Sequence, residues 1–113
     1  MRIRRAITLA GGGRWPDAAG GFGVRFNWVK VDNRGSNAVD VALSATPAAG
    51  DKVDTLLTVG AGKVRVFNVA GPKNADGTNT EDWPDEINLV SASGTNVVLE
   101  VADHPIVDFS LAT

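Results

Sequence analysis

Apolar residues recur at every second position along much of this chain. The clearest case is residues 22–28, where the alternate positions are Phe22, Val24, Phe26 and Trp28. A period of two is typical of a β-strand that buries one face and exposes the other. We therefore expect a half-buried strand here, with Trp28 facing the core on the same side as Phe26 and Val24.

The same alternation returns in shorter segments separated by turn-forming residues. These segments cover residues 2–10, 39–43, 53–59, 63–69, 87–91, 97–101 and 106–111. Gly60-Ala61-Gly62 lies between two of them, and we interpret it as a hairpin turn. No segment has a helical period. Seven or eight short antiparallel strands predict an all-β fold, either a β-sandwich or a jelly roll.

The chain divides most naturally at residue 21. Residues 1–21 form an N-terminal strand or arm followed by a Gly-rich connector, and residues 22–113 form the sandwich domain. The arm carries Arg2, Arg4 and Arg5 and then three glycines, which are costly to order without a partner. We expect it to be held by another chain, so that deleting residues 1–12 leaves the domain folded but abolishes assembly.

Charge is unevenly distributed along the chain. The formal net charge is −2, yet residues 1–35 contain seven basic and two acidic residues, and the rest contain four basic and eleven acidic ones. This asymmetry is compatible with solvated faces, or with a bipolar molecule that docks its basic end on an acidic neighbour or on another copy of itself. Nucleic acid is a weaker expectation, because the arginines lack interleaved aromatic residues.

The composition restricts the chemistry available. With no cysteine and one histidine, the chain has neither a disulfide nor a His/Cys zinc site. No apolar run approaches the ~20 residues of a membrane span. His104 is the only histidine that could serve a nucleophilic triad, and no Gly-x-Ser-x-Gly elbow accompanies it. We predict no enzymatic activity and no cofactor.

Two acidic segments resemble chemical sites, but a solvated or partner-facing loop is the stronger expectation. Residues 74–82 contain enough oxygen ligands to attract calcium, but their order differs from that of an EF-hand loop. Asp82, Asp85 and Glu86 could supply paired carboxylates for glycoside chemistry, but no aromatic cleft surrounds them in the sequence. We therefore predict no metal site.

Trp15 and Trp83 each precede a proline in a polar or Gly-rich segment. Such a tryptophan is either a lid on its own core or an anchor in a pocket of a partner, and a sugar-stacking platform is a further alternative. We place both tryptophans, with Arg2, Arg4 and Arg5, among the partner-binding residues. For Trp83 we expect an interface role.

The second half of the chain resembles small structural proteins of tailed-bacteriophage virions. The resemblance is carried by the turn at residues 58–63, the strand Val66-Phe67-Asn68-Val69, and residues 85–101 with their Ser93-Gly94-Thr95 turn. It implies a capsid-decoration or cement subunit in the virion, assembled in the cytoplasm of the bacterial host. Its partners would be a major capsid or other virion protein and further copies of itself. The alternatives are a tail or fibre-base component, or a carbohydrate-binding β-sandwich.

Overall fold

The computed structural model describes residues 2–15, 24–42, 57–70, 75–76, 83–84 and 86–106. These residues contain eight β-strands and no helix. The strands are β1 (Arg2–Leu9), β2 (Arg14–Trp15), β3 (Trp28–Asn33), β4 (Val39–Ala42), β5 (Leu57–Val59), β6 (Val64–Asn68), β7 (Asn88–Val90) and β8 (Thr95–Ala102). The all-β prediction is confirmed.

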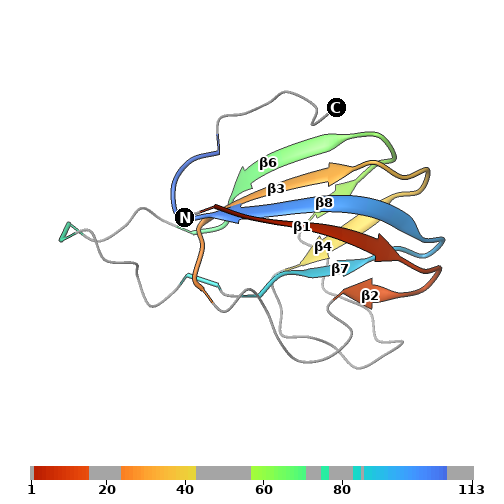
Figure 1. The fold of residues 1–113 in the computed structure, drawn as a ribbon, viewed down its shortest axis with the longest axis horizontal. Helices are drawn as coiled ribbons and strands as arrows, with labels where there is room; N and C mark the ends of the chain where they lie inside the picture. The colour runs from red at the N-terminus through yellow and green to blue at the C-terminus, as the bar shows by residue number, and fades with distance from the viewer. Residues whose placement is uncertain are drawn as a thin grey trace.

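The strands form two four-stranded antiparallel sheets that pack face to face (Figure 1). Sheet A has the order β1-β8-β3-β6, and sheet B has the order β2-β7-β4-β5. Strands at the same place in the two orders are consecutive in the chain: β1 with β2, β8 with β7, β3 with β4, and β6 with β5. This is the strand order of an eight-stranded jelly roll, so the sandwich predicted from the sequence has jelly-roll topology.

Four short connections therefore cross from one sheet to the other, and they gather at one end of the sandwich (Figure 1). We call them the four arches: residues 10–13, 34–38, 60–63 and 91–94. The prediction of a hairpin at residues 60–62 is wrong, because β5 pairs with β4 while β6 pairs with β3. A tight turn with a left-handed glycine, here Gly62 at φ 70°, serves either a hairpin or an arch. The local sequence therefore does not distinguish them.

The core lies between the sheets and is built from the inward positions of the strands. Sheet A contributes Val29, Val31, Val97, Leu99 and Val101, and sheet B contributes Val39, Val41, Val59 and Leu89. All of these are at most 1 % exposed. Close packing of β-branched and leucine side chains between two pleated sheets is the main favourable contribution to the stability of such a fold.

The N-terminal residues are a strand of this sandwich and not a separable arm. All eight residues of β1 pair with β8, from Arg2 opposite Ala102 to Leu9 opposite Thr95. Ile7 and Leu9 belong to the buried core. The described residues 2–12 are therefore held by their own domain, which contradicts the expectation that another chain holds them. The effect of deleting residues 1–12 stays a prediction.

The strand expected at residues 22–28 begins only at Trp28. Residues 22 and 23 lie outside the described residues, and Val24 is exposed. A bend at Asn27 interrupts the alternation, so Phe26 is buried while the core-facing residues of β3 are Val29 and Val31. Trp28 is consequently half-buried on the outer face of sheet A, opposite Ala102. The prediction that Trp28 faces the core is wrong.

Candidate functional site

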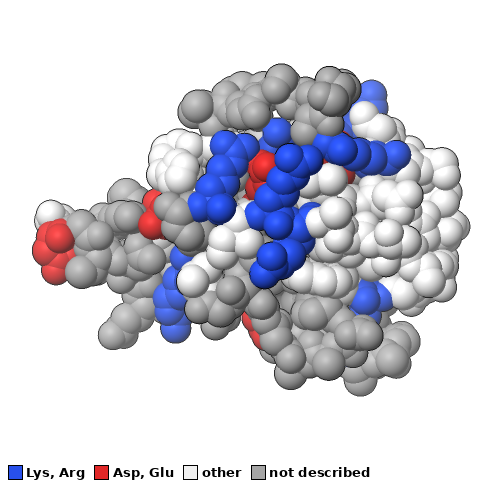
Figure 2. Space-filling view, viewed as in Figure 1, with Lys and Arg blue, Asp and Glu red and all other residues white. Residues whose placement is uncertain are grey.

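The outer face of sheet A carries a cluster of charged residues centred on Glu100. In the strand register, Arg4 of β1 and Lys30 of β3 both lie opposite Glu100 of β8. Nη2 of Arg2 donates to Oε2 of Glu100 at 2.6 Å, and Nε of Arg4 lies 4.0 Å from Oε1. Figure 2 shows basic side chains gathered over the middle of this face, partly covering an acidic one.

The acidic members of this cluster are buried and the arginines are exposed. The Glu100 side chain is 11 % exposed, against 36 % for Arg2 and 55 % for Arg4. A second pair repeats the arrangement, since Nε of Arg34 lies 2.9 Å from Oδ2 of Asp32, and the Asp32 side chain is only 6 % exposed. The surface available to a partner is therefore positive. We call the exposed Arg2, Arg4 and Arg34, with the buried Lys30, Glu100 and Asp32 beneath them, the basic face.

Long arginine side chains suit this position. Their aliphatic stems cover the sheet while the guanidinium groups remain at the surface. Lys30 is 2 % exposed and Glu100 8 % exposed on the face that points away from the core. A buried charge is tolerated only when it is paired, and Glu100 has this pairing from Arg2 and, at longer range, from Arg4. The cluster thus has a fixed buried base and an exposed cationic top.

Arg5 occupies a different environment from Arg2 and Arg4. It lies opposite Leu99, in register with the core-facing positions Ile3 and Ile7, and it is nevertheless exposed. Arg65 on β6 has the equivalent position at the other edge, opposite Val31, and is also exposed. A charged residue on the inward side of an edge strand disfavours uncontrolled pairing with another sheet. The structure therefore brings Arg2 and Arg4 together and separates Arg5 from them.

The two tryptophans pack against their own domain. Trp83 is 0 % exposed and is the largest fully buried side chain among the described residues. Its carbonyl oxygen accepts a hydrogen bond from Nη1 of Arg25, and the Pro84 carbonyl accepts one from the backbone of Phe26. The expected interface role of Trp83 is wrong in this structure, because its ring is enclosed by its own chain. The lid alternative describes it correctly.

Trp15 is half-buried and packs on the core from β2, where it lies opposite Leu89. It offers less surface to a partner than we expected, and its core contact again agrees with the lid alternative. A sugar platform built on both tryptophans is contradicted by the burial of Trp83.

A buried asparagine, Asn33, joins the 34–38 arch to the ends of β5 and β8 that border two other arches. Nδ2 of Asn33 donates to the carbonyls of Asn37 at 2.8 Å and Val59 at 3.0 Å. Its Oδ1 accepts from the Thr95 hydroxyl at 2.7 Å and from the Gly35 backbone at 3.2 Å. All four hydrogen bonds available to the amide are made. The arch end of the molecule is therefore held by a specific polar network.

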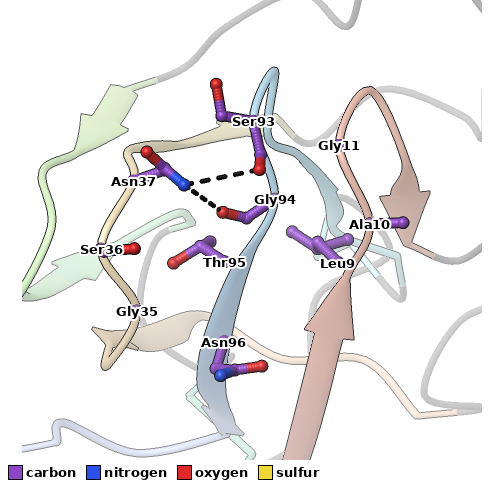
Figure 3. A pocket seen from close by; sticks show the side chains of 10 residues that line it. All are labelled: Leu9, Ala10, Gly11, Gly35, Ser36, Asn37, Ser93, Gly94, Thr95 and Asn96. Atoms are coloured by element: carbon purple, nitrogen blue, oxygen red, sulfur yellow. Dashed lines mark hydrogen bonds between the residues drawn. The ribbon is translucent and has the colours of Figure 1, made fainter.

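An open cavity of about 480 Å³ lies at this arch end. Residues 9–11, 35–37 and 93–96 line it. Figure 3 shows the Asn37 amide directed at the carbonyls of Ser93 and Gly94, to which it donates at 3.4 Å and 2.8 Å. The lining is mainly backbone, hydroxyl and amide groups, with Leu9 and Ala10 as its apolar members and no charged side chain. It is a polar recess that suits hydrogen bonding.

The other sequence candidates have no shared site in the described structure. His104 is exposed, with Nδ1 3.1 Å from Oδ1 of its neighbour Asp103. The described residues contain no group of three His, Cys, Asp or Glu side chains suited to a metal ion. Most of the calcium-loop candidate, residues 74–82, and the carboxylates Asp82 and Asp85 lie outside the described residues. Among the described residues, no helix is long and apolar enough to cross a membrane.

Sequence reasoning missed Lys30, Glu100 and Asn33 as members of these clusters. Glu100 did carry a signal, because it interrupts an apolar strand at an outward position. Its partners lie 98 and 70 positions earlier in the chain, at Arg2 and Lys30. Only the sheet order makes them neighbours.

The comparisons with known proteins add no relative. No protein-family model, curated protein or solved structure matches the chain. The functional argument therefore rests on the residues and their geometry.

Proposed function

We propose that this chain is a non-catalytic structural subunit of a tailed-bacteriophage virion, of the capsid-decoration or cement type. It binds a major capsid or other virion protein through its basic face, and copies of the subunit associate with one another. The observation that carries the binding role is the arrangement of exposed Arg2 and Arg4 over buried Glu100. The resemblance of residues 58–101 to virion proteins supplies the setting.

The basic face is built for docking on an acidic surface. Its exposed guanidinium groups provide charge-assisted, often bidentate, hydrogen bonds to carboxylates. Complementary charge accelerates encounter and fixes the orientation of the partners. On a shell with many equivalent sites, modest contacts of this kind add up through repetition and self-association.

The fold is compatible with this proposal. Jelly rolls occur in viral capsid proteins as well as in lectins and cupins, so the fold alone does not select the function. The segments that carry the resemblance form the β5–β6 and β7–β8 arches and their strands. They supply half of the arch end, and the other two arches complete it. In the proposed subunit, the binding face is the basic face on the outer side of sheet A.

The test is whether the chain is a stoichiometric component of phage particles and whether the basic face keeps it there. Purified particles are analysed by quantitative mass spectrometry, after separation of heads from tails by sedimentation. We expect the chain in the head fraction at a fixed ratio to the major capsid protein. Recovery only with tails would favour the tail or fibre-base alternative, and absence from all particles would refute the proposal.

A pair of variants tests the face itself. The double substitution Arg2→Gln and Arg4→Gln should lower binding to stripped particles at least tenfold, whereas Arg65→Gln, on the opposite edge of sheet A, should leave it unchanged. Thermal unfolding of the isolated variants checks that each is folded. Equal binding by both variants would remove the basic face from the mechanism.

A further inference from the structure

β1 is an edge strand whose outer side is open. Sheet A ends at β1, which pairs with β8 along all eight residues and has no second partner among the described strands. Every second residue of an edge strand directs its backbone N–H and C=O groups away from the sheet. Arg2, Arg4, Arg5, Ala6 and Thr8 are exposed in the complete chain. The edge is therefore accessible over most of its length.

The side chains along this edge select the strand that could pair with it. Arg4 and Arg5 are adjacent and lie on opposite faces of β1, on the outer and the core-facing side respectively. Arg5 makes no ion pair with any residue that the structure describes. On the outer side of β1, Arg2 and Arg4 lie over the carboxylate of Glu100, whereas Arg5 lies on the other side of the strand. The side chains of β1 itself carry three positive charges and no negative one, so the edge is cationic on both faces.

We propose that the free edge of β1 binds an extended acidic segment of a partner protein as an additional strand of sheet A. Backbone hydrogen bonds would supply affinity, and carboxylates opposite Arg4 and Arg5 would supply specificity on both faces. The proposal rests on the proposed function, because the acidic segment would belong to the neighbouring subunit that the basic face contacts. It adds the mode of binding and the chemistry of the partner.

Two other occupants fit this edge less well. A second copy pairing through its own β1 would bring two sets of three arginines into one ribbon, which is repulsive. A single nucleic-acid strand would gain from stacking on exposed aromatic rings, and β1 contains no aromatic residue. An acidic strand would both hydrogen-bond the free backbone groups of β1 and balance the positive charge of its arginines.

The experiment uses the intact protein and a synthetic octapeptide of valine and threonine with three glutamates. Two matched peptides serve as controls: one is N-methylated at alternate residues, which removes the pairing donors without changing charge, and one has lysines in place of the glutamates. Binding is followed by amide chemical shifts and hydrogen exchange of the labelled protein, at peptide concentrations up to about 1 mM, the range of weak association.

We expect saturable binding of the glutamate peptide alone, with at least tenfold slower exchange at alternate amides of β1. The double substitution Arg4→Gln and Arg5→Gln should weaken this binding at least tenfold, and Arg65→Gln should not. Equal binding of the N-methylated peptide would show simple charge attraction and overturn strand addition. Absence of binding up to the highest concentration, protection on β6, or tighter binding of an oligothymidylate would also overturn it. None of these outcomes changes the particle analysis, so the proposed function is tested separately.

Discussion

The burial of Trp83 and Trp28 is the opposite of what their sequence contexts suggest. Trp83 lies in a polar segment before a proline, yet it is completely buried, whereas Trp28 continues an apolar alternation and is half-buried on the outer face. Burial of a side chain depends on what packs over it from distant parts of the chain. Neither ring can be placed from its immediate neighbours.

Truncation of these two residues should therefore have unequal effects on stability. Trp83→Ala removes a fully enclosed ring and should lower the free energy of unfolding by about 3–5 kcal/mol. Trp28→Ala should cost about 1–2 kcal/mol, because its ring is already partly hydrated. Urea unfolding followed by far-UV circular dichroism measures both. Trp83→Phe is the matched control and should cost less than alanine, because Nε1 of Trp83 has no hydrogen-bond partner in the described structure. A larger loss for Trp28→Ala would contradict the assigned faces of β3.

Asn33 is the residue on which the arch end depends most. Asn33→Ala leaves the Val59 carbonyl and the Thr95 hydroxyl buried without their partner. Such orphaned groups cost about 1–3 kcal/mol each, and we expect a total loss of about 2–4 kcal/mol in urea unfolding. Asn37→Ala, which removes hydrogen bonds at a more accessible site, should cost about 1 kcal/mol or less. Equal losses at the two positions would show that Asn33 is not the centre of the network.

At the scale of the element, β1 both contributes to the core and displays charge at the surface. Its core-facing side contributes Ile7 and Leu9 to the core. Its other side and its edge present Arg2 and Arg4 to solvent. The same strand therefore stabilises the sandwich and displays the charges of the basic face.

Removal of β1 should prevent folding. Deleting residues 2–9 removes two buried aliphatic side chains, worth about 2–5 kcal/mol each, and exposes the edge of β8. This loss is comparable with the whole stability of a small domain, about 5–15 kcal/mol. We expect no cooperative thermal transition in calorimetry. Arg5→Gln, which keeps the strand and changes only an exposed charge, should melt within a few degrees of the unmodified protein. A cooperative thermal transition in the deletion variant would show instead that the N-terminal segment can be removed without unfolding the domain.

The arches depend on close approach between loops. A β-carbon at Gly35 would lie 1.9 Å from Oγ1 of Thr95 and 2.6 Å from the backbone nitrogen of Asn96. Gly62 has positive φ but no atom within 4 Å of such a carbon. Gly62→Ala should therefore cost only the left-handed backbone preference, about 1–2 kcal/mol. Gly35→Ala should cost more, because backbone must move. Thermal unfolding of the two variants gives their order, and the reverse order would contradict the packing of the 34–38 arch against β8.

For the whole molecule, the jelly roll joins strands that are distant in the chain. β8 pairs on one side with β1 and on the other with β3. In sheet B, β7 likewise lies between β2 and β4. One of the two central strands in each sheet, β8 in sheet A and β7 in sheet B, therefore comes from the last part of the described chain. Neither sheet can be completed until these distant segments meet.

This topology predicts slow folding. Domains dominated by non-local strand pairing fold in milliseconds to seconds. The chain loses the entropy of loop closure before the distant contacts form and stabilise it. We expect a main refolding phase in this range by stopped-flow tryptophan fluorescence, which reports the burial of Trp83. A main phase in microseconds would mean that local hairpins form first, in conflict with the arches.

The sequence by itself determined the class of this fold and much of its strand content. Alternation placed Val39 and Val41 on an inward face, and the same rule placed Val97, Leu99 and Val101 there, because a strand buries one side of its pleat. Turn residues located the connections near 34–36, 60–62 and 93–94. These features are local, because each is encoded by residues within a short segment of the sequence.

The tertiary structure alone decided which strands are neighbours. Three outcomes depend on residues far apart in the chain. They are whether Gly60-Ala61-Gly62 makes a hairpin or an arch, whether Trp83 meets a partner or its own core, and whether Arg2 and Arg4 reach Glu100. A local pattern specifies which side of a strand is apolar but not which strand covers it. That choice is made by the arrangement that buries the most apolar surface over the whole chain while satisfying groups such as Asn33.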